Sequence, residues 1–209
     1  YIAAGHPTRE DAVAAAQAVA DAGFDFLEIG IPYNDPVADG PVIAAALDRA
    51  VKNGITPSDV FDDIETLSVL GIPIYVMTYS NIILHAGPEK VTERLRGKVK
   101  GFVIADLPNR MQNFLTDRGL GIPIIPFVTP ETREQDLEIV AKSKADFIYL
   151  IGLRGITGSK ADFSSPALLK QIEMIRKVTD KKIVLGFGIR TRDDARQALE
   201  TAGGFVAGT

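Results

Sequence analysis

One stretch decides the fold, and it reads Phe26-Leu27-Glu28-Ile29-Gly30-Ile31-Pro32-Tyr33-Asn34-Asp35-Pro36-Val37-Ala38-Asp39-Gly40-Pro41. An apolar run ends at a glycine, a proline-rich loop follows, and a helix-like segment begins after it. The run carries Glu28 near its end, and the loop carries Asp35 and Asp39. A buried strand accommodates an acid only where the acid is paired or does chemistry. In parallel α/β folds chemistry lies at the carboxyl ends of the strands, so this stretch predicts an active site.

Apolar runs alternate with helix-like segments along the whole chain. We expect strands over Tyr1–Ala4, Phe26–Gly30, Ile74–Met77, Gly101–Ala105, Ile122–Val128, Phe147–Ile151, Ile183–Gly186 and Phe205–Ala207. We expect helices over roughly 8–23, 41–52, 56–71, 88–95, 111–118, 134–142, 165–178 and 191–201, from their capping and proline signals. This alternation predicts one (β/α)8 barrel over residues 1–209. An open doubly wound sheet is the alternative, but no Gly-x-Gly-x-x-Gly turn follows the first strand.

Composition narrows the function classes. The 209 residues are 46% hydrophobic and 24% charged, which suits one globular domain with a sizeable core. A net charge of −4 gives no reason to expect a nucleic-acid partner. Cysteine is absent and no apolar run approaches the length of a membrane span, so a cytoplasmic enzyme or binding domain is expected. The chain opens inside one strand and stops after another, so we expect the extreme N-terminus and a final C-terminal helix to be missing from it.

Two acids of the opening stretch, Glu28 and Asp39, each have two interpretations. Dehydration at a barrel mouth raises the pKa of Glu28 and suits it to proton exchange, but Glu28 could also be half of a buried ion pair. Asp39 lies on a loop stiffened by prolines, where it could hold a donor or merely cap the helix that opens at Pro41. Asp35 could simply be a turn residue, together with Pro36.

Glycine turns follow the late strands, at Gly155-Ile156-Thr157-Gly158, Gly186-Phe187-Gly188-Ile189 and Gly208-Thr209. Each turn alone could be an ordinary loop. Together, at matching strand ends, their clustered N–H groups predict a phosphate site. We expect the rest of the mouth to be a flat apolar pocket, for which core packing is the alternative role of its aromatic members. The expected substrate-binding residues are Tyr79, Asp106, Phe127, Tyr149, Thr157 and Phe187. No metal is expected, because His6 and His85 are isolated.

The motif Leu27–Pro32, followed by Asp35–Pro41, resembles the signature of the tryptophan synthase α subunit family. Further similarity lies in the segments Tyr1–Pro7, Asp106–Pro108, Thr157-Gly158, Gly186–Gly188 and Gly208-Thr209. The resemblance implies a (β/α)8 fold that cleaves indole-3-glycerol phosphate to indole and glyceraldehyde 3-phosphate. It also implies a pyridoxal-phosphate β subunit as partner and no cofactor in this chain.

Residue by residue, the resemblance makes Glu28 the catalytic acid/base and Asp39 the partner of the indole N–H. It places Tyr149 in the active site. It assigns phosphate contacts to Gly158, Gly188, Ile189, Gly208 and Thr209. It puts the loop residues Pro32, Tyr33, Asp35 and Pro36 at the β-subunit face.

Departures from the family pattern keep rival hypotheses open. Ile151–Gly155 replaces a common Ser-Arg pattern, which puts closure of that loop in doubt and keeps a stand-alone indole lyase open. A catalytically weak subunit that only activates a β partner is a second rival, against which the intact Glu28 and Asp39 argue. An unrelated barrel isomerase is a third, against which the long loop motif argues.

Overall fold

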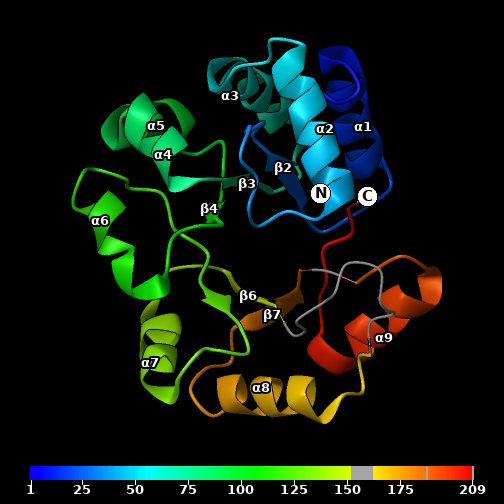
Figure 1. Ribbon diagram of the computed structural model, residues 1–209, viewed down its shortest axis with the longest axis vertical. Helices are drawn as coiled ribbons and strands as arrows, with labels where there is room; N and C mark the ends of the chain where they lie inside the picture. Colours follow the sequence, from blue (N-terminus) through cyan, green and yellow to red (C-terminus); the bar gives the residue numbers. More distant parts are fainter. Residues whose placement is uncertain (152–161, 187, 209) are drawn as a thin grey trace. The chain divides into compact units, whose positions relative to one another are not determined.

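The structure is a computed structural model, and it describes residues 1–151, 162–186 and 188–208 (Figure 1). These residues form two compact units. Within the described part of the chain, unit 1 comprises residues 1–107 and 111–123, and unit 2 comprises residues 108–110 and the described portion of 124–208. No helix among the described residues is both long enough and apolar enough to cross a bilayer.

Unit 1 is built on a parallel sheet with the strand order β1-β2-β3-β4. The strands are β1 (Ile2–Ala3), β2 (Leu27–Gly30), β3 (Ile74–Thr78) and β4 (Gly101–Ile104). Every residue of β2 and of β4 is buried, as the continuous apolar runs predict for a sheet covered on both faces. The register pairs Glu28 with Tyr75 and Gly30 with Met77.

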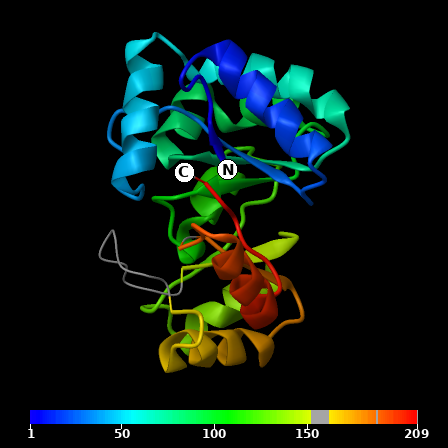
Figure 2. The same cartoon turned by 90° about the vertical axis from the view of Figure 1, so that its right-hand side faces the viewer.

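Four helices of unit 1 begin at a capping side chain or at a proline, which has no N–H group to satisfy. Thr56 and Asp59 form a full capping box, and the Thr8 side chain accepts from the Asp11 N–H. Helix α1 contacts β1, β2 and α3, and α2 contacts β1 (Figure 2). The helices are α1 (Arg9–Asp21), α2 (Pro41–Lys52), α3 (Pro57–Leu67), η1 (Ser68–Leu70), α4 (Ser80–Ala86), α5 (Pro88–Leu95) and α6 (Asn113–Thr116). The 3-10 helix η2 (Asn109–Met111) has its first two residues in unit 2 and Met111 in unit 1.

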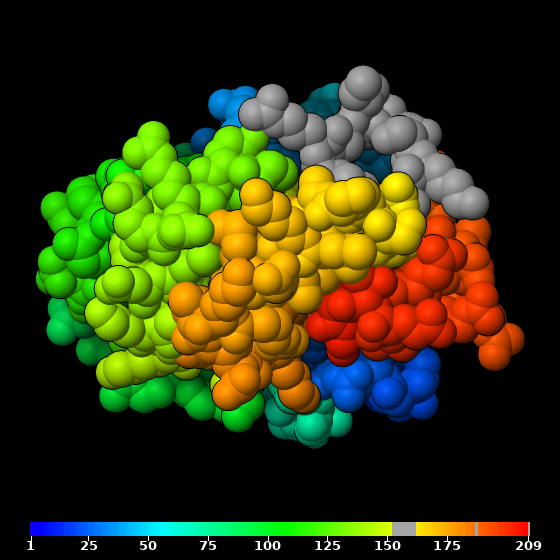
Figure 3. Space-filling view, turned by 90° about the horizontal axis from the view of Figure 1, so that it is seen from below, coloured from blue at the N-terminus to red at the C-terminus, as the bar shows by residue number. Residues whose placement is uncertain are grey.

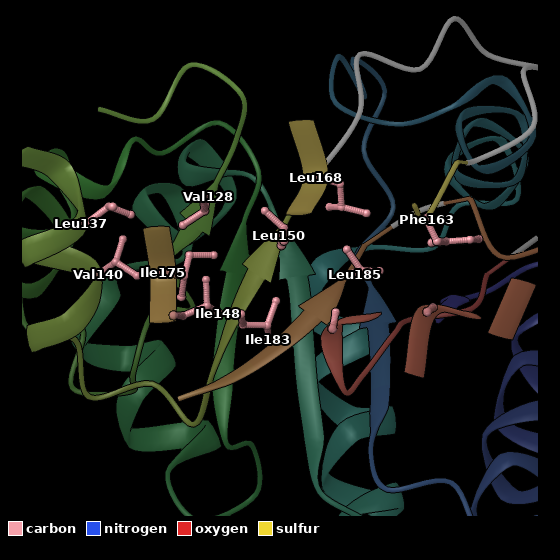
Figure 4. Packing of buried hydrophobic residues seen from close by; sticks show 12 residues of the cluster. Val128, Leu137, Val140, Ile148, Leu150, Phe163, Leu168, Ile175, Ile183 and Leu185 are labelled. Carbon is pink, nitrogen blue, oxygen red and sulfur yellow. The ribbon is translucent and has the colours of Figure 1, made fainter. Parts of the chain in front are cut away.

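Unit 2 holds a second parallel sheet, in the order β5-β6-β7. Its strands are β5 (Phe127–Val128), β6 (Phe147–Leu150) and β7 (Lys182–Leu185), and its helices are α7 (Glu134–Lys142), α8 (Pro166–Arg176) and α9 (Arg192–Ala202). The three helices gather on one face of the unit (Figure 3). Strand residues such as Ile148, Leu150 and Ile183 pack there against the helix residues Val140 and Ile175 (Figure 4).

The expected elements differ from the observed ones in four places. The predicted strand Ile122–Val128 is wrong for most of its length, because Pro123 and Pro126 offer no N–H and only β5 remains. The predicted strand Phe205–Ala207 is reduced to an isolated bridge between Leu185 and Phe205. The helix predicted over residues 111–118 is the shorter α6, and α4 was not expected at all.

Candidate active site

Glu28 is a buried carboxyl group in the middle of β2. Its side chain is 1% exposed, which confirms the dehydration expected from its place in an apolar run. Burial penalises the charged form of a carboxyl group, so such a group exchanges protons more readily near neutral pH than an exposed one does. Glu28 therefore has the environment that an acid/base residue requires.

The phenol of Tyr1 lies on the same face of β2 as Glu28. A Cβ atom built on Gly30 would lie 2.0 Å from the Tyr1 hydroxyl oxygen, so only glycine permits this approach. Residues 28 and 30 point to one face of the strand, because side chains alternate along it. Burial raises the pKa of the Tyr1 phenol, and the negative charges of Asp39 and Glu28 raise it further. Sequence reasoning missed this role, although a tyrosine opening the neighbouring strand was its signal.

Asp39 is held by Tyr79. The Tyr79 hydroxyl donates to Asp39 Oδ2 over 2.7 Å and accepts from the Ala38 N–H over 3.2 Å. The N-cap of α2 is Gly40, so Asp39 does not have the capping role that was its alternative. Burial raises the pKa of the Asp39 carboxyl, and the Tyr79 hydrogen bond opposes that rise. Burial and the bond to Asp39 raise the pKa of Tyr79, so its hydroxyl remains a donor.

A second contact fixes the same loop. The rings of Tyr33 and Tyr79 pack with centroids 4.5 Å apart, and the Asn81 side chain donates to the Tyr33 hydroxyl over 2.9 Å. Tyr33, predicted to face a partner, is thus half-buried and also contacts the residue that holds Asp39.

The remaining loop residues differ in exposure. Pro32 is buried, which leaves Tyr33, Asp35 and Pro36 as the predicted interface residues that can present surface. Val37, which was not singled out from sequence, is 76% exposed. The sequence signal for this exposed residue is an apolar valine in a loop of prolines and acids.

Asp106 supports α4. Its carboxylate accepts from the Ser80 N–H and from Ser80 Oγ, each over 2.7 Å, and so supplies the cap that α4 lacks locally. This arrangement gives Asp106 a structural role. Its contact with substrate stays a prediction.

Two of the aromatic residues predicted for the mouth come together in unit 2. Phe127 and Tyr149 are paired across β5 and β6, with ring centroids 5.3 Å apart. The Asn109 side chain clamps β5 by donating to the Phe127 carbonyl and accepting from its N–H, over 2.6 and 3.0 Å. A Cβ at Gly186 would lie 1.7 Å from the Tyr149 ring, so this glycine is required by a close approach.

The described parts of the glycine turns are consistent with a phosphate site. Gly188 has a φ of +88°, and the parallel bridge from Leu185 to Phe205 leaves Gly188 and Gly208 each three residues beyond it. Gly208 is exposed, and Ile189 packs on the core of unit 2. The predicted site residues Thr157, Gly158, Phe187 and Thr209 lie outside the described residues. Within the described ranges, no three His, Asp or Glu side chains gather as metal ligands would.

Comparison with known proteins gives concordant matches. A family model described as tryptophan synthase alpha chain matches residues 1–209. The tryptophan synthase alpha chain of Trichormus variabilis is 37% identical over 206 residues, a match covering 96% of this chain and 76% of that protein. That of Aquifex aeolicus is 33% identical over 214 residues, covering 100% of this chain and 82% of that protein.

Solved structures agree with these sequence matches. Mycobacterium tuberculosis tryptophan synthase aligns with a TM-score of 0.86 at 29% identity, covering 98% of this chain and 79% of that chain. A structure of the tryptophan synthase a2b2 complex from the hyperthermophile Pyrococcus furiosus aligns with a TM-score of 0.86 at 27% identity, covering 99% of this chain and 85% of that chain.

Proposed function

Because this chain belongs to the tryptophan synthase alpha chain family, we propose that it cleaves indole-3-glycerol phosphate to indole and glyceraldehyde 3-phosphate by a retro-aldol reaction. The chain is an alpha subunit of tryptophan biosynthesis and has the (β/α)8 fold of the family. One observation carries the proposed reaction. Unit 1 holds a buried Glu28 on a strand and an Asp39 carboxylate fixed by a tyrosine, which are the two groups that this cleavage requires.

Glu28 handles the protons. Cleavage of the bond between indole C3 and the glyceryl carbon requires C3 to gain a proton and the adjacent glyceryl hydroxyl to lose one. A single carboxyl group can serve both transfers in turn when its pKa lies near the working pH. The burial of Glu28 supports this role, because dehydration penalises the ionised form of a carboxyl group and so brings its neutral form, which donates to C3, and its ionised form, which accepts from the hydroxyl, closer in free energy.

Asp39 stabilises the charge that develops. Protonation at C3 places positive charge on the indole ring, and its N–H becomes a stronger hydrogen-bond donor. A fixed carboxylate beside that N–H lowers the barrier, because it requires no reorganisation as the charge forms. The Tyr79 hydrogen bond supports this assignment, since it orients the carboxylate and favours its ionised form.

Substrate binding is the proposed work of unit 2. We assign the phosphate to the turns containing Gly158, Gly188, Ile189, Gly208 and Thr209, and apolar contacts to Phe127 and Tyr149. Phosphate binding far from the scissile bond supplies energy that positions the reacting atoms. The positive φ of Gly188 supports the assignment, because a glycine in that conformation can be one of the residues of a backbone nest, the concavity in which successive N–H groups bind an anion.

A β subunit is the proposed partner, docking on the loop of Tyr33, Asp35, Pro36 and Val37. The high exposure of Val37 supports this surface, because an apolar side chain gains from being covered. In this proposal the pyridoxal phosphate belongs to the partner, this chain needs no cofactor, and the complex works in the cytoplasm. Neither nucleic acid nor a membrane is a proposed partner.

Indole release by the full-length protein, measured with and without a β subunit, tests the proposal. We expect slow release by the protein alone and a rate that rises and saturates with β-subunit concentration. Absence of indole under both conditions would exclude the lyase activity. Fast release that ignores the partner would favour the stand-alone lyase over the subunit.

A further inference from the structure

A pocket in unit 1, away from Glu28 and Asp39, has no part in the proposed reaction. It lies among α3, α4 and α5 and has a volume of about 640 Å³. We propose that this α3–α5 pocket binds a small amphipathic carboxylate, an aromatic or branched aliphatic acid. Pockets of about 300–1,000 Å³ are typical of sites for small molecules.

The wall of the pocket supplies an apolar surface for the hydrocarbon part of such a ligand. Phe61 of α3, Ile82 of α4 and Val91 of α5 line it, and all three side chains are buried to more than nine-tenths of their area. Because they come from three packed helices, this surface is formed in advance of binding. An aromatic ring or branched chain placed against it would lose contact with water and gain dispersion contacts.

The charged residues of the pocket favour an anion. His85, Lys90 and Arg94 line it, and no acidic residue is among the described residues that do. The Arg94 guanidinium is already engaged, because it pairs with Asp62 and Glu65 and lies 5.4 Å above the Phe61 ring. Lys90 has no ion pair within the part of the chain that the structure describes. Its ammonium group therefore remains available to a carboxylate.

Occupancy of the pocket would bear on Asp39 through three observed contacts. Asn81 lines the pocket and donates to the Tyr33 hydroxyl over 2.9 Å. The Tyr33 ring packs on Tyr79, whose hydroxyl holds Asp39. A ligand that touches Asn81 thus acts on the group proposed to stabilise the charged indole, and this consequence rests on the proposed function.

Binding is tested on the full-length protein with 3-phenylpropionate and its uncharged counterpart 3-phenylpropionamide, using calorimetry and NMR shift mapping. For the acid we expect a dissociation constant on the order of 1 mM, as for fragments of this size. The amide should bind more weakly. Lys90→Gln should raise the dissociation constant of the acid by roughly fivefold, the effect of losing one partly exposed charge pair. Lys100→Gln, which removes an exposed lysine outside the pocket, is the matched control and should change nothing.

Several outcomes would overturn the inference. These are equal affinity for acid and amide, no effect of Lys90→Gln, or shifts that map away from the α3–α5 pocket. Loss of phenylpropionate binding on addition of β subunit would instead identify the pocket as surface covered by the partner. The binding arm does not depend on activity, so it is informative even if the protein releases no indole. If it does, phenylpropionate at a concentration near its wild-type dissociation constant should change kcat in wild type, and should change it clearly less in Lys90→Gln at the same concentration.

Discussion

Each unit contains a tyrosine side chain packed against a glycine, but the groups around the two contacts differ. In unit 1 the Tyr1 phenol lies against Gly30, beside two carboxyl groups whose charges raise its pKa. In unit 2 the Tyr149 ring lies against Gly186 and packs on Phe127. Gly30 ends a strand and Gly186 follows one. At each position a side chain would overlap the neighbouring tyrosine ring, so only glycine fits. The surrounding groups differ, since unit 1 gathers proton-bearing groups and unit 2 gathers rings and glycine turns.

This difference predicts a division of kinetic effects. An interaction made only in the transition state lowers kcat when it is lost, whereas an interaction made equally with the bound substrate raises KM. Variants in unit 1 should therefore act mainly on kcat, and variants in unit 2 mainly on KM. The predictions that follow test that division.

The largest effect is expected for Glu28→Gln. The amide keeps the size of the side chain and removes the titratable proton, so kcat for indole release should fall by about 100- to 10,000-fold. KM should change little, because the proposed phosphate contacts lie elsewhere. Glu10→Gln, at an exposed position of α1, is the matched control. Indole release near the wild-type rate would remove Glu28 from the mechanism.

In unit 2 the strongest variant is Gly188→Val. A branched side chain at a φ of +88° is strained and stands where the backbone is proposed to meet phosphate, so KM should rise by at least about tenfold. Gly203→Val controls for strain, since Gly203 has a φ of +91° at the end of α9 and open space around it. Both variants should lose stability in thermal melts. A rise in KM in both, or in neither, would argue against the phosphate assignment.

Much of this architecture could be predicted from sequence, and the misses have physical causes. Continuous apolar runs fixed β2, β4 and β6 to within about a residue, because strands buried on both faces leave that pattern. Helix α4 was missed because its cap comes from Asp106, which lies 26 residues away from Ser80. The burial of Glu28 was predicted from its own run. The contact of Tyr1 with Gly30 was not predicted, because it joins residues far apart in the chain and produces no periodic pattern in the sequence.

Alanine substitutions at Gly30 and Gly186 compare the two tyrosine–glycine contacts directly. Alanine at Gly30 must displace the Tyr1 ring, and alanine at Gly186 must displace Tyr149, since the added Cβ would lie 2.0 and 1.7 Å from them. Each should cost about 1–3 kcal/mol of stability from overpacking. We expect Gly30→Ala to lower kcat by roughly fivefold and Gly186→Ala to raise KM by roughly fivefold, in steady-state assays of indole release.

Gly121→Ala provides the reference for these two variants. Its Cβ would meet Thr92 at 3.1 Å, a contact that a small shift relieves, so neither kcat nor KM should change appreciably. If Gly30→Ala and Gly186→Ala changed the same kinetic parameter, the functional difference between the units would be wrong.

The smallest effect is expected for Tyr79→Phe, and its value lies in the pH profile. The variant keeps the ring that packs on Tyr33 and loses the hydroxyl that donates to Asp39. That hydrogen bond favours ionised Asp39 against burial, so its removal should raise the pKa of the carboxyl further. Asp39 must be ionised to stabilise the charged indole, so the acid limb of kcat/KM should move to higher pH. At neutral pH kcat should fall by roughly two- to fivefold, the effect of one hydrogen bond.

Tyr33→Phe is the control variant. It removes a hydroxyl that bonds to Asn81 instead, so the acid limb of its kcat/KM profile should stay in place. An unmoved acid limb in Tyr79→Phe would mean that Tyr79 does not control the ionisation of Asp39.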